Sequence, residues 1–224
     1  MKFDEVHILF EQSGTFKKVF AAHGYNVTEY DIEKTENVDF DTDIFAEIEL
    51  ASANRFISLF HDIHDSDLVL AFFPCTYFSD QSQLLSRGDS FGQKTWSEKQ
   101  KLEYSLEQMN KRNEFFNYLC KLCLIAIEKG FKLIIENPYG KVNFLKWFFP
   151  LKPELVIQDR RIYGDFFKKP TQFFFINCVP EFKLFPEADK TKFTANPVED
   201  KRGFDRSRIA PIFAENFCNQ FIFD

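Results

Sequence analysis

Residues 68–73, Leu-Val-Leu-Ala-Phe-Phe, are an uninterrupted apolar run that ends at Pro74 and Cys75. Such a run without charge is typical of a parallel strand that is buried on both faces. Because proline cannot continue a hydrogen-bonded ladder, we expect it to end the strand and to lift the cysteine out at the carboxyl edge of the sheet. That edge is where α/β proteins place their ligands and reactive groups.

A second apolar segment, residues 133–135, leads directly into Glu136, Asn137 and Pro138. We expect another parallel strand here, which brings a carboxylate to the same edge as the thiol of Cys75. A carboxylate at the end of an apolar strand is costly to bury unless it is paired or faces a ligand. A thiol and a carboxylate on the ends of parallel strands suggest covalent chemistry on a flat heterocycle.

The rest of the pattern predicts one α/β domain over residues 1–224. Its first part is a βαβ unit with a tight loop after the first strand, which would accept a nucleotide-like ligand. The polar, serine-rich residues 76–95 are expected to be a mobile loop that covers Cys75. Further strands are predicted at residues 6–10, 26–30, 155–157 and 171–177, and helices at 15–22, 45–60 with a break near Ser52, 97–130, 142–149 and 211–221.

The 224-residue chain has a net charge of −6, which gives it no overall attraction to a polyanion. Its charge is uneven, because residues 129–169 hold nine basic and four acidic residues, a surplus of five positive charges. The five cysteines are odd in number and lack the spacing of a secreted framework, so we expect free thiols in the cytoplasm. Residues 1–5 do not resemble a signal peptide, and charge interrupts every apolar stretch before it could span a membrane.

Several cysteine and histidine residues can be explained by core packing or by a solvated turn, without a catalytic or metal-binding role. A lone cysteine after a strand is more often inert packing than a nucleophile, although Pro74 and the polar residues after Cys75 favour a wet site. Cys120 and Cys123 have metal-like spacing but lie inside a predicted helix without a second pair, so we expect them in the core. Residues 61–65, His-Asp-Ile-His-Asp, could bind a metal, and a solvated turn explains them as well. We predict no metal site.

Eight short motifs follow one another along nearly the whole chain. They are residues 10–16 (Phe-Glu-Gln-Ser-Gly-Thr-Phe), 24–25 (Gly-Tyr), Asp31, 73–75 (Phe-Pro-Cys), 136–138 (Glu-Asn-Pro), 163–164 (Tyr-Gly), 169–171 (Lys-Pro-Thr) and 206–209 (Arg-Ser-Arg-Ile). In this order and spacing they resemble the DNA cytosine-5 methyltransferase family, in particular its compact phage and mobile-element members. The Pro-Cys and Glu-Asn-Pro elements are the most specific of them.

The resemblance implies a Rossmann-like S-adenosylmethionine-dependent methyltransferase fold, with a mixed, mostly parallel seven-stranded sheet and helices on both faces. It implies transfer of a methyl group to carbon 5 of a cytosine that is flipped out of duplex DNA. By resemblance, Cys75 is the thiolate that adds to carbon 6 of the base, and Glu136 holds and protonates its ring nitrogen N3. The substrate is expected to contact Asn137, Pro138, Arg160 and Arg161.

The same resemblance places the cofactor S-adenosylmethionine at the carboxyl ends of the first strands. Asp31 would accept hydrogen bonds from the ribose hydroxyls, and Asp43 would face the adenine amine. The other residues expected to hold the cofactor, mostly at its methionine end, are Phe10, Gln12, Ser13, Gly14, Thr15 and Pro74.

Two features depart from the family pattern. The first loop keeps only Gly14 where two or three glycines are usual, so that Glu11 and Gln12 would crowd the methionine pocket, or Glu11 would pair with the cofactor ammonium. Only residues 179–205 are available as a target-recognition segment, which is expected to be vestigial or assisted by a separate DNA-recognition subunit. Two alternatives therefore stay open: an inactive methyltransferase-like protein that binds DNA or another partner, and a methyltransferase that acts on RNA or a free nucleotide.

Overall fold

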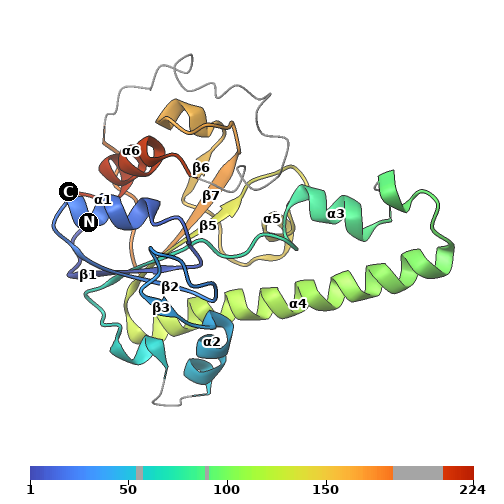
Figure 1. The fold of residues 1–224 in the computed structure, drawn as a ribbon, viewed down its shortest axis with the longest axis horizontal. Coiled ribbons are helices and arrows are strands. Elements are labelled where there is room, and N and C mark those ends of the chain that lie inside the picture. Colours follow the sequence, from blue (N-terminus) through green and yellow to red (C-terminus); the bar gives the residue numbers. More distant parts are fainter. Residues whose placement is uncertain (54–57, 89–90, 184–208) are drawn as a thin grey trace.

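A seven-stranded sheet lies at the centre of the computed structural model, which describes residues 1–53, 58–88, 91–183 and 209–224 (Figure 1). The strand order is β3-β2-β1-β4-β5-β7-β6, which places β4 in the middle. The strands are β1 (Glu5–Leu9), β2 (Asn26–Asp31), β3 (Phe40–Asp41), β4 (Leu68–Ala71), β5 (Lys132–Pro138), β6 (Leu155–Ile157) and β7 (Thr171–Ile176).

The sheet is mixed and mostly parallel. β1, β2, β3, β4 and β5 run in the same direction, while β7 runs antiparallel to both of its neighbours, β5 and β6. The predicted α/β class with a mostly parallel sheet is therefore confirmed. The carboxyl ends of β1, β2, β4 and β5 meet at one edge, where the loops that follow them carry the residues singled out in the sequence.

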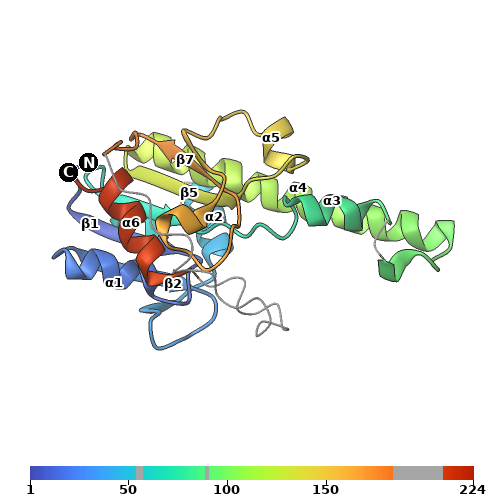
Figure 2. The same ribbon diagram turned by 90° about the horizontal axis from the view of Figure 1, so that it is seen from above.

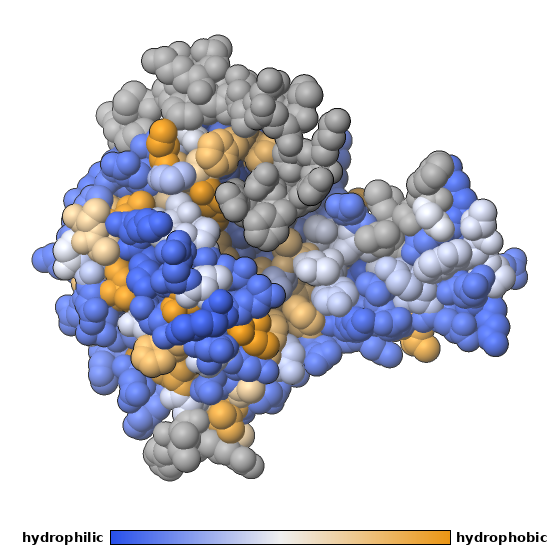
Figure 3. Space-filling model, in the orientation of Figure 1, coloured by the Kyte–Doolittle hydropathy of each residue, from blue (hydrophilic) through white to orange (hydrophobic). Residues whose placement is uncertain are grey.

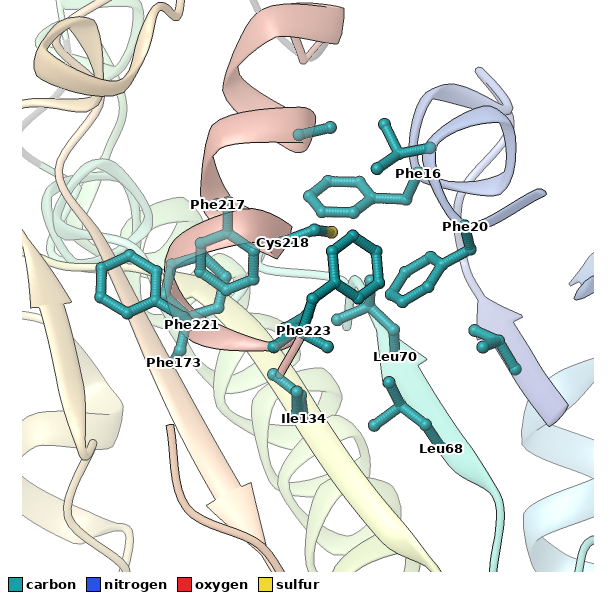
Figure 4. Close-up of a cluster of buried hydrophobic side chains, with 14 of the residues drawn as sticks. Phe16, Phe20, Leu68, Leu70, Ile134, Phe173, Phe217, Cys218, Phe221 and Phe223 are labelled. Atoms are coloured by element: carbon teal, nitrogen blue, oxygen red, sulfur yellow. The ribbon is translucent and has the colours of Figure 1, made fainter. Parts of the chain in front are cut away.

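Helices cover both faces of the sheet (Figures 1 and 2). α1 (Thr15–Ala22) and α6 (Pro211–Phe221) pack on one face, and α2 (Ile44–Ser52) and α4 (Glu98–Lys129) on the other. β4 shows the alternation that this layering requires: Leu68 and Leu70 belong to the α1/α6 core, whereas Val69 and Ala71 belong to the α2/α4 core. Phenylalanine fills much of the first core, as Figure 4 shows for Phe16, Phe20, Phe173, Phe217, Phe221 and Phe223.

α4 extends well beyond the sheet. Its start is fixed by a capping box, in which Ser97 Oγ accepts from Gln100 N and Gln100 Oε1 accepts from Ser97 N, and it ends at the left-handed Gly130. At 32 residues it is about 48 Å long by the rise of an α-helix. Its first half projects from the body together with α3 (Asp80–Ser86), and this arm is mostly hydrophilic on the face shown in Figure 3.

Several boundaries differ from the sequence prediction. The prediction of a loop over residues 76–95 is wrong, because α3 and a 3₁₀ helix (Phe91–Gln93) lie there. The serines misled it: Ser82 Oγ and Ser86 Oγ donate to backbone carbonyls one turn earlier, so these polar side chains are satisfied inside a helix. The helix predicted at 45–60 is α2, followed after residues 54–57 by a 3₁₀ helix (Leu59–Asp62), and the two-residue β3 was not predicted.

The remaining elements are α5 (Phe144–Phe148) and a 3₁₀ helix (Arg160–Tyr163). Of the predicted recognition segment, residues 184–205 lie outside the described residues, as do residues 206–208 of the last motif. None of the described helices has both the length and the apolar character that crossing a membrane requires.

Candidate active site at the carboxyl ends of β4 and β5

Cys75 lies in the turn between β4 and α3. Its carbonyl accepts hydrogen bonds from Phe78 N (3.0 Å) and Ser79 N (3.2 Å), so the turn is closed directly behind the thiol. The cysteine is partly exposed, in contrast to Cys123 and Cys218, which are buried in the core. Burial raises the pKa of the Cys75 thiol, the negative charge of Glu136 raises it further, and Lys169 lowers it. The Cys75 thiol is therefore protonated at neutral pH.

Glu136 lies near the end of β5, one strand away from the Cys75 turn. It is 8 % exposed, and its Oε1 is 3.9 Å from Nη1 of Arg160. The two predicted catalytic groups therefore lie at the same edge of the sheet, on neighbouring strands. The strand register explains this, since Ala71, the last residue of β4, pairs with Ile135, the residue before Glu136.

Arg160 is fully buried beneath Glu136. Its Nε is 2.6 Å from Oδ2 of Asp165, and its guanidinium carbon lies 4.1 Å from the ring centre of Phe213. Asp165 is held in turn by Phe166 N (2.8 Å) and Ala210 N (3.2 Å). In this position Arg160 is a support for the Glu136 carboxylate and is not exposed to a substrate.

Arg161, the neighbouring predicted substrate residue, is partly exposed and forms a two-bond ion pair with Asp159 (2.9 and 2.7 Å). Asn137 is fully buried, and its Nδ2 donates to Phe73 O (3.2 Å), which ties the end of β5 to the segment before Cys75. The carbonyl of Pro138 accepts from Asn143 Nδ2 (2.9 Å) and Gln172 Nε2 (3.0 Å). These contacts fix the backbone on which Glu136 is carried.

A cleft of about 560 Å³ adjoins this pair of strand ends. One wall is held by hydrogen bonds: the Asp80 carboxylate accepts from Lys141 N (3.0 Å) and Val142 N (3.2 Å). Residue 140 is a glycine, and a Cβ at this position would lie only 2.1 Å from the Asp80 carboxylate. The cleft is lined by Ser79, Asp80, Gln81, Pro138, Tyr139, Gly140, Lys141, Asn143, Gln158, Lys169 and Pro170.

The loop after β1 has an unusual backbone. Phe10 adopts a left-handed conformation (φ +62°), which is strained for a residue with a side chain and is typical of functional sites. Its ring packs against Phe45 and Phe73, the latter directly before Pro74. Gly14 (φ +64°) begins α1, and a Cβ there would lie 2.6 Å from Asn37, so only glycine fits.

Two of the predicted cofactor residues meet at the end of β2. Asp31 is buried, and its Oδ1 accepts from Gln12 Nε2 (3.1 Å) and from Glu33 N (2.9 Å). Ser13 Oγ contacts Glu11 Oε1 and lies 2.6 Å from Thr15 Oγ1, so this loop is internally hydrogen bonded. Asp43 lies further away in the chain and is exposed, with its Oδ1 accepting from Phe45 N (3.1 Å) and Ala46 N (3.3 Å) as the N-cap of α2.

Sequence reasoning did not single out Glu29. This residue of β2 is fully buried beside Glu11, and neither of its carboxylate oxygens nor Oε2 of Glu11 has a hydrogen-bond partner. Burial, reinforced by the charge of Glu11, raises the pKa of Glu29 to about 8. Burial also raises the pKa of Glu11, although amides at the start of α1 oppose this. The signal was available, because Glu29 lies two residues after Val27 and so on the same face of β2, and Val27 packs against the α1/α6 core.

Comparison with known proteins gives no relative for this chain: no protein-family model matches it, and no curated protein is detectably similar in sequence. Within the described residues, no group of three or more His, Cys, Asp or Glu side chains is arranged to hold a metal ion. Function is therefore inferred from the residues at the edge of the sheet.

Proposed function

We propose that this protein transfers a methyl group from S-adenosylmethionine to carbon 5 of cytosine in DNA. The observation that carries the proposal is the placement of Cys75 and Glu136 at the carboxyl ends of the paired strands β4 and β5, where Ala71 pairs with Ile135, the residue before Glu136. The seven-stranded mixed sheet and the order of the sequence motifs support it. A cleft lined by Ser79 and Pro138 lies next to this edge, although neither Cys75 nor Glu136 lines it.

The two side chains supply what the reaction needs. Carbon 5 of cytosine is a poor nucleophile, so the Cys75 thiol gives its proton to the Glu136 carboxylate and adds to carbon 6 as the thiolate; N3 takes that proton from Glu136, and the electron pair moves to carbon 5. After carbon 5 is methylated, its proton leaves to a base, the carbon–sulfur bond breaks and N3 returns its proton to Glu136, which restores the aromatic ring and the thiolate. A neutral Glu136 also removes the negative charge that raises the pKa of Cys75.

The loop after β1 fits the cofactor that the proposal requires, which supplies an electrophilic methyl group on sulfur. Glu11 and Gln12 do not need to crowd that loop, because Glu11 folds back onto Ser13 and Gln12 onto Asp31. The buried, unpartnered Oε2 of Glu11 would accept a hydrogen bond from the ammonium group. Asp31 would accept from the ribose hydroxyls.

A covalent-trapping experiment tests the proposal. The protein is incubated with radiolabelled S-adenosylmethionine and either plain duplex DNA or duplex DNA that contains 5-fluorocytosine. We expect label in the plain DNA, and with the fluorinated DNA a protein–DNA complex that survives detergent, because carbon 5 then has no proton to release. Label in DNA without trapping would overturn the covalent mechanism, and the absence of both would overturn the proposed function.

The second candidate is a protein of the same shape that binds DNA without catalysis, favoured by the first loop, in which Gly14 is the single glycine. Calorimetry with S-adenosylmethionine separates the two candidates, because a protein that can no longer bind the cofactor gives no heat of binding. Parallel incubations with RNA and with free cytidine nucleotides show whether the methyl acceptor is RNA or a free nucleotide instead of DNA.

A further inference from the structure

The segment after β5 exposes large aromatic side chains next to the cleft. Trp147 is 67 % and Phe148 64 % exposed, and both belong to α5. The lysines Lys141 and Lys146 are exposed in the same segment. Figure 2 shows α5 projecting from the body of the molecule. We call Lys141, Lys146, Trp147 and Phe148 the α5 surface.

The α5 surface is continuous with the cleft. The ammonium group of Lys146 lies 5.8 Å from the ring centre of Tyr139 and 5.7 Å from that of Trp147, so it bridges the two rings. Tyr139 and Lys141 line the cleft. A polymer that places one unit in the cleft would therefore pass over Lys146 and Trp147.

The exposed rings are carried on a well-anchored helix. Asn143 caps α5 by accepting from Leu145 N (2.9 Å), and Leu145 is buried in the α2/α4 core. Phe144 stacks on Phe78, and Phe148 stacks on Phe144 with ring centres 4.6 Å apart. Because the inner side chains hold α5 in place, Trp147 is presented to solvent by a fixed support.

The segment itself is basic, although the Asp80 carboxylate of the cleft accepts from Lys141 N and Val142 N. Residues 137–153 contain Lys141, Lys146 and Lys152 and no carboxylate, in a chain whose net charge is −6. Lysines that contact phosphates supply affinity, and exposed aromatic rings stack on bases or insert between base steps. A cytosine that leaves the helix also leaves its neighbours partly unstacked, which gives an aromatic ring a place to bind.

We propose that the α5 surface binds the DNA on either side of the target cytosine, with Lys141 and Lys146 on phosphates and Trp147 stacked on a base. This inference rests on the proposed function and gives it a DNA contact outside residues 179–205. It assigns the binding of target DNA to α5, the short helix that follows β5, the strand of Glu136, in the chain.

Tryptophan fluorescence tests the contact directly, because Trp96 and Trp147 are the two tryptophans of the chain. In the Trp96→Phe variant, all tryptophan emission comes from Trp147, and we expect a duplex DNA to quench it as the ring stacks. In the Trp147→Phe variant, the emission of Trp96 should stay unchanged. Undiminished Trp147 emission with DNA bound would overturn the proposal.

Affinity measurements complete the test, with labelled duplex DNA titrated at several salt concentrations. Trp147→Ala should weaken binding roughly ten-fold, the loss of about one stacking contact. Lys141→Ala with Lys146→Ala should reduce the slope of log affinity against log salt by about two. Lys99→Ala with Leu102→Ala, on the exposed arm of α4, is the matched control and should change neither quantity.

The outcomes separate this inference from the proposed function. A wild-type protein that methylates DNA while the α5 variants bind as tightly as the wild type overturns the α5 surface alone. A wild-type protein that neither binds nor methylates DNA overturns both. A variant that loses self-association in sedimentation but keeps its DNA affinity identifies a second copy of the chain as the occupant, and overturns the DNA proposal.

Discussion

The two halves of the carboxyl edge treat their buried carboxylates differently. At the ends of β4 and β5, Glu136 lies 3.9 Å from the fully buried Arg160. At the ends of β1 and β2, Glu11 and Glu29 are buried beside each other, and the nearby Lys17 is already hydrogen bonded to Asn37 O (2.8 Å) and Asp39 (2.7 Å). The β4/β5 half places a buried cation, Arg160, beside its acid. The β1/β2 half buries two acids, Glu11 and Glu29, and burial disfavours the charged form of both.

The difference shows which half already holds a cation beside its buried acid. A buried charge is tolerated when it is paired, and Arg160 lies within ion-pair distance of Glu136, although Oε1 of Glu136 accepts no hydrogen bond. An unpaired buried acid takes up a proton or waits for a cationic partner, as the raised pKa of Glu29 indicates. The β4/β5 half is therefore preorganised, while the β1/β2 half is expected to change its protonation state when a charged group binds.

The largest effect is expected in the preorganised half. Cys75→Ser should abolish methyl transfer, because a serine hydroxyl is far harder to ionise than a thiol, and it should leave the heat of S-adenosylmethionine binding unchanged. Cys120→Ser, which changes a partly exposed thiol of α4, is the control and should keep full activity. If the Cys75→Ser variant methylates DNA at the wild-type rate, measured with radiolabel, Cys75 is not the nucleophile and the β4/β5 half has another role.

Glu136→Gln should lower the rate of transfer by about 10²–10⁴, the usual contribution of a positioned acid. It should also move the alkaline rise of the pH–rate profile. The negative charge of Glu136 raises the pKa of Cys75, so its removal lets the thiolate form at a lower pH. A profile measured from pH 6 to 10 checks this shift, and an unmoved profile would show that the two groups are not coupled during the reaction.

Arg160→Met tests the internal cation itself. It leaves Glu136 and Asp165 without their partner, and breaking a buried pair in this way costs about 3–5 kcal/mol. The matched control is Arg161→Met, which breaks a partly exposed pair with Asp159 and should cost no more than about 1 kcal/mol. Urea unfolding of the two variants measures both values, and equal losses would contradict the view that Arg160 supports this half.

Local patterns were sufficient to predict much of this architecture. Of the apolar run at residues 68–73, the strand β4 (Leu68–Ala71) is buried on both faces as expected but ends two residues early, and α1 has the predicted bounds, because glycines at 14 and 24 mark its two ends. The position of Cys75 and Glu136 at one edge also followed from local signals, since parallel strands bring their carboxyl ends together. Serine-rich α3 was missed because its polarity resembles that of a loop.

Contacts between distant segments could not be predicted. Glu11 and Glu29 meet only because β1 and β2 pair side by side; the strand pattern of β2 could place Glu29 on an inward face, but nothing local shows that Glu11 lies beside it. The support of Glu136 by Arg160 likewise depends on a 3₁₀ helix that folds under β5. α5 spans five residues, too few for a periodic pattern, so the exposure of Trp147 could be seen only in three dimensions.

Glu29→Gln sharpens the contrast in the other half. The folded protein holds the Glu29 proton up to a pH of about 8, whereas the unfolded chain releases it near the ordinary value of 4.5. Stability from this group is therefore full below pH 4.5 and is lost as the pH rises to 8. Because glutamine cannot ionise, the variant should be more stable than the wild type by a few kcal/mol at pH 9, with the difference vanishing towards pH 4.5. The exposed Glu33→Gln is the control, and a pH-independent difference would contradict the buried acid pair.

Asp43 gives the smallest effect and separates two roles of one carboxylate at the outer side of the β1/β2 half. Asp43→Ala removes the N-cap of α2 and should cost about 1 kcal/mol of stability, whereas Asp43→Ser keeps a capping oxygen and should cost only a few tenths. If the carboxylate also accepts a hydrogen bond from the adenine amine, both variants should weaken S-adenosylmethionine binding several-fold in calorimetry, although only one of them is destabilised. Unchanged cofactor affinity in the Asp43→Ser variant would limit Asp43 to capping α2, and the cofactor contacts of this half would then be confined to Asp31 and the loop between Phe10 and Thr15.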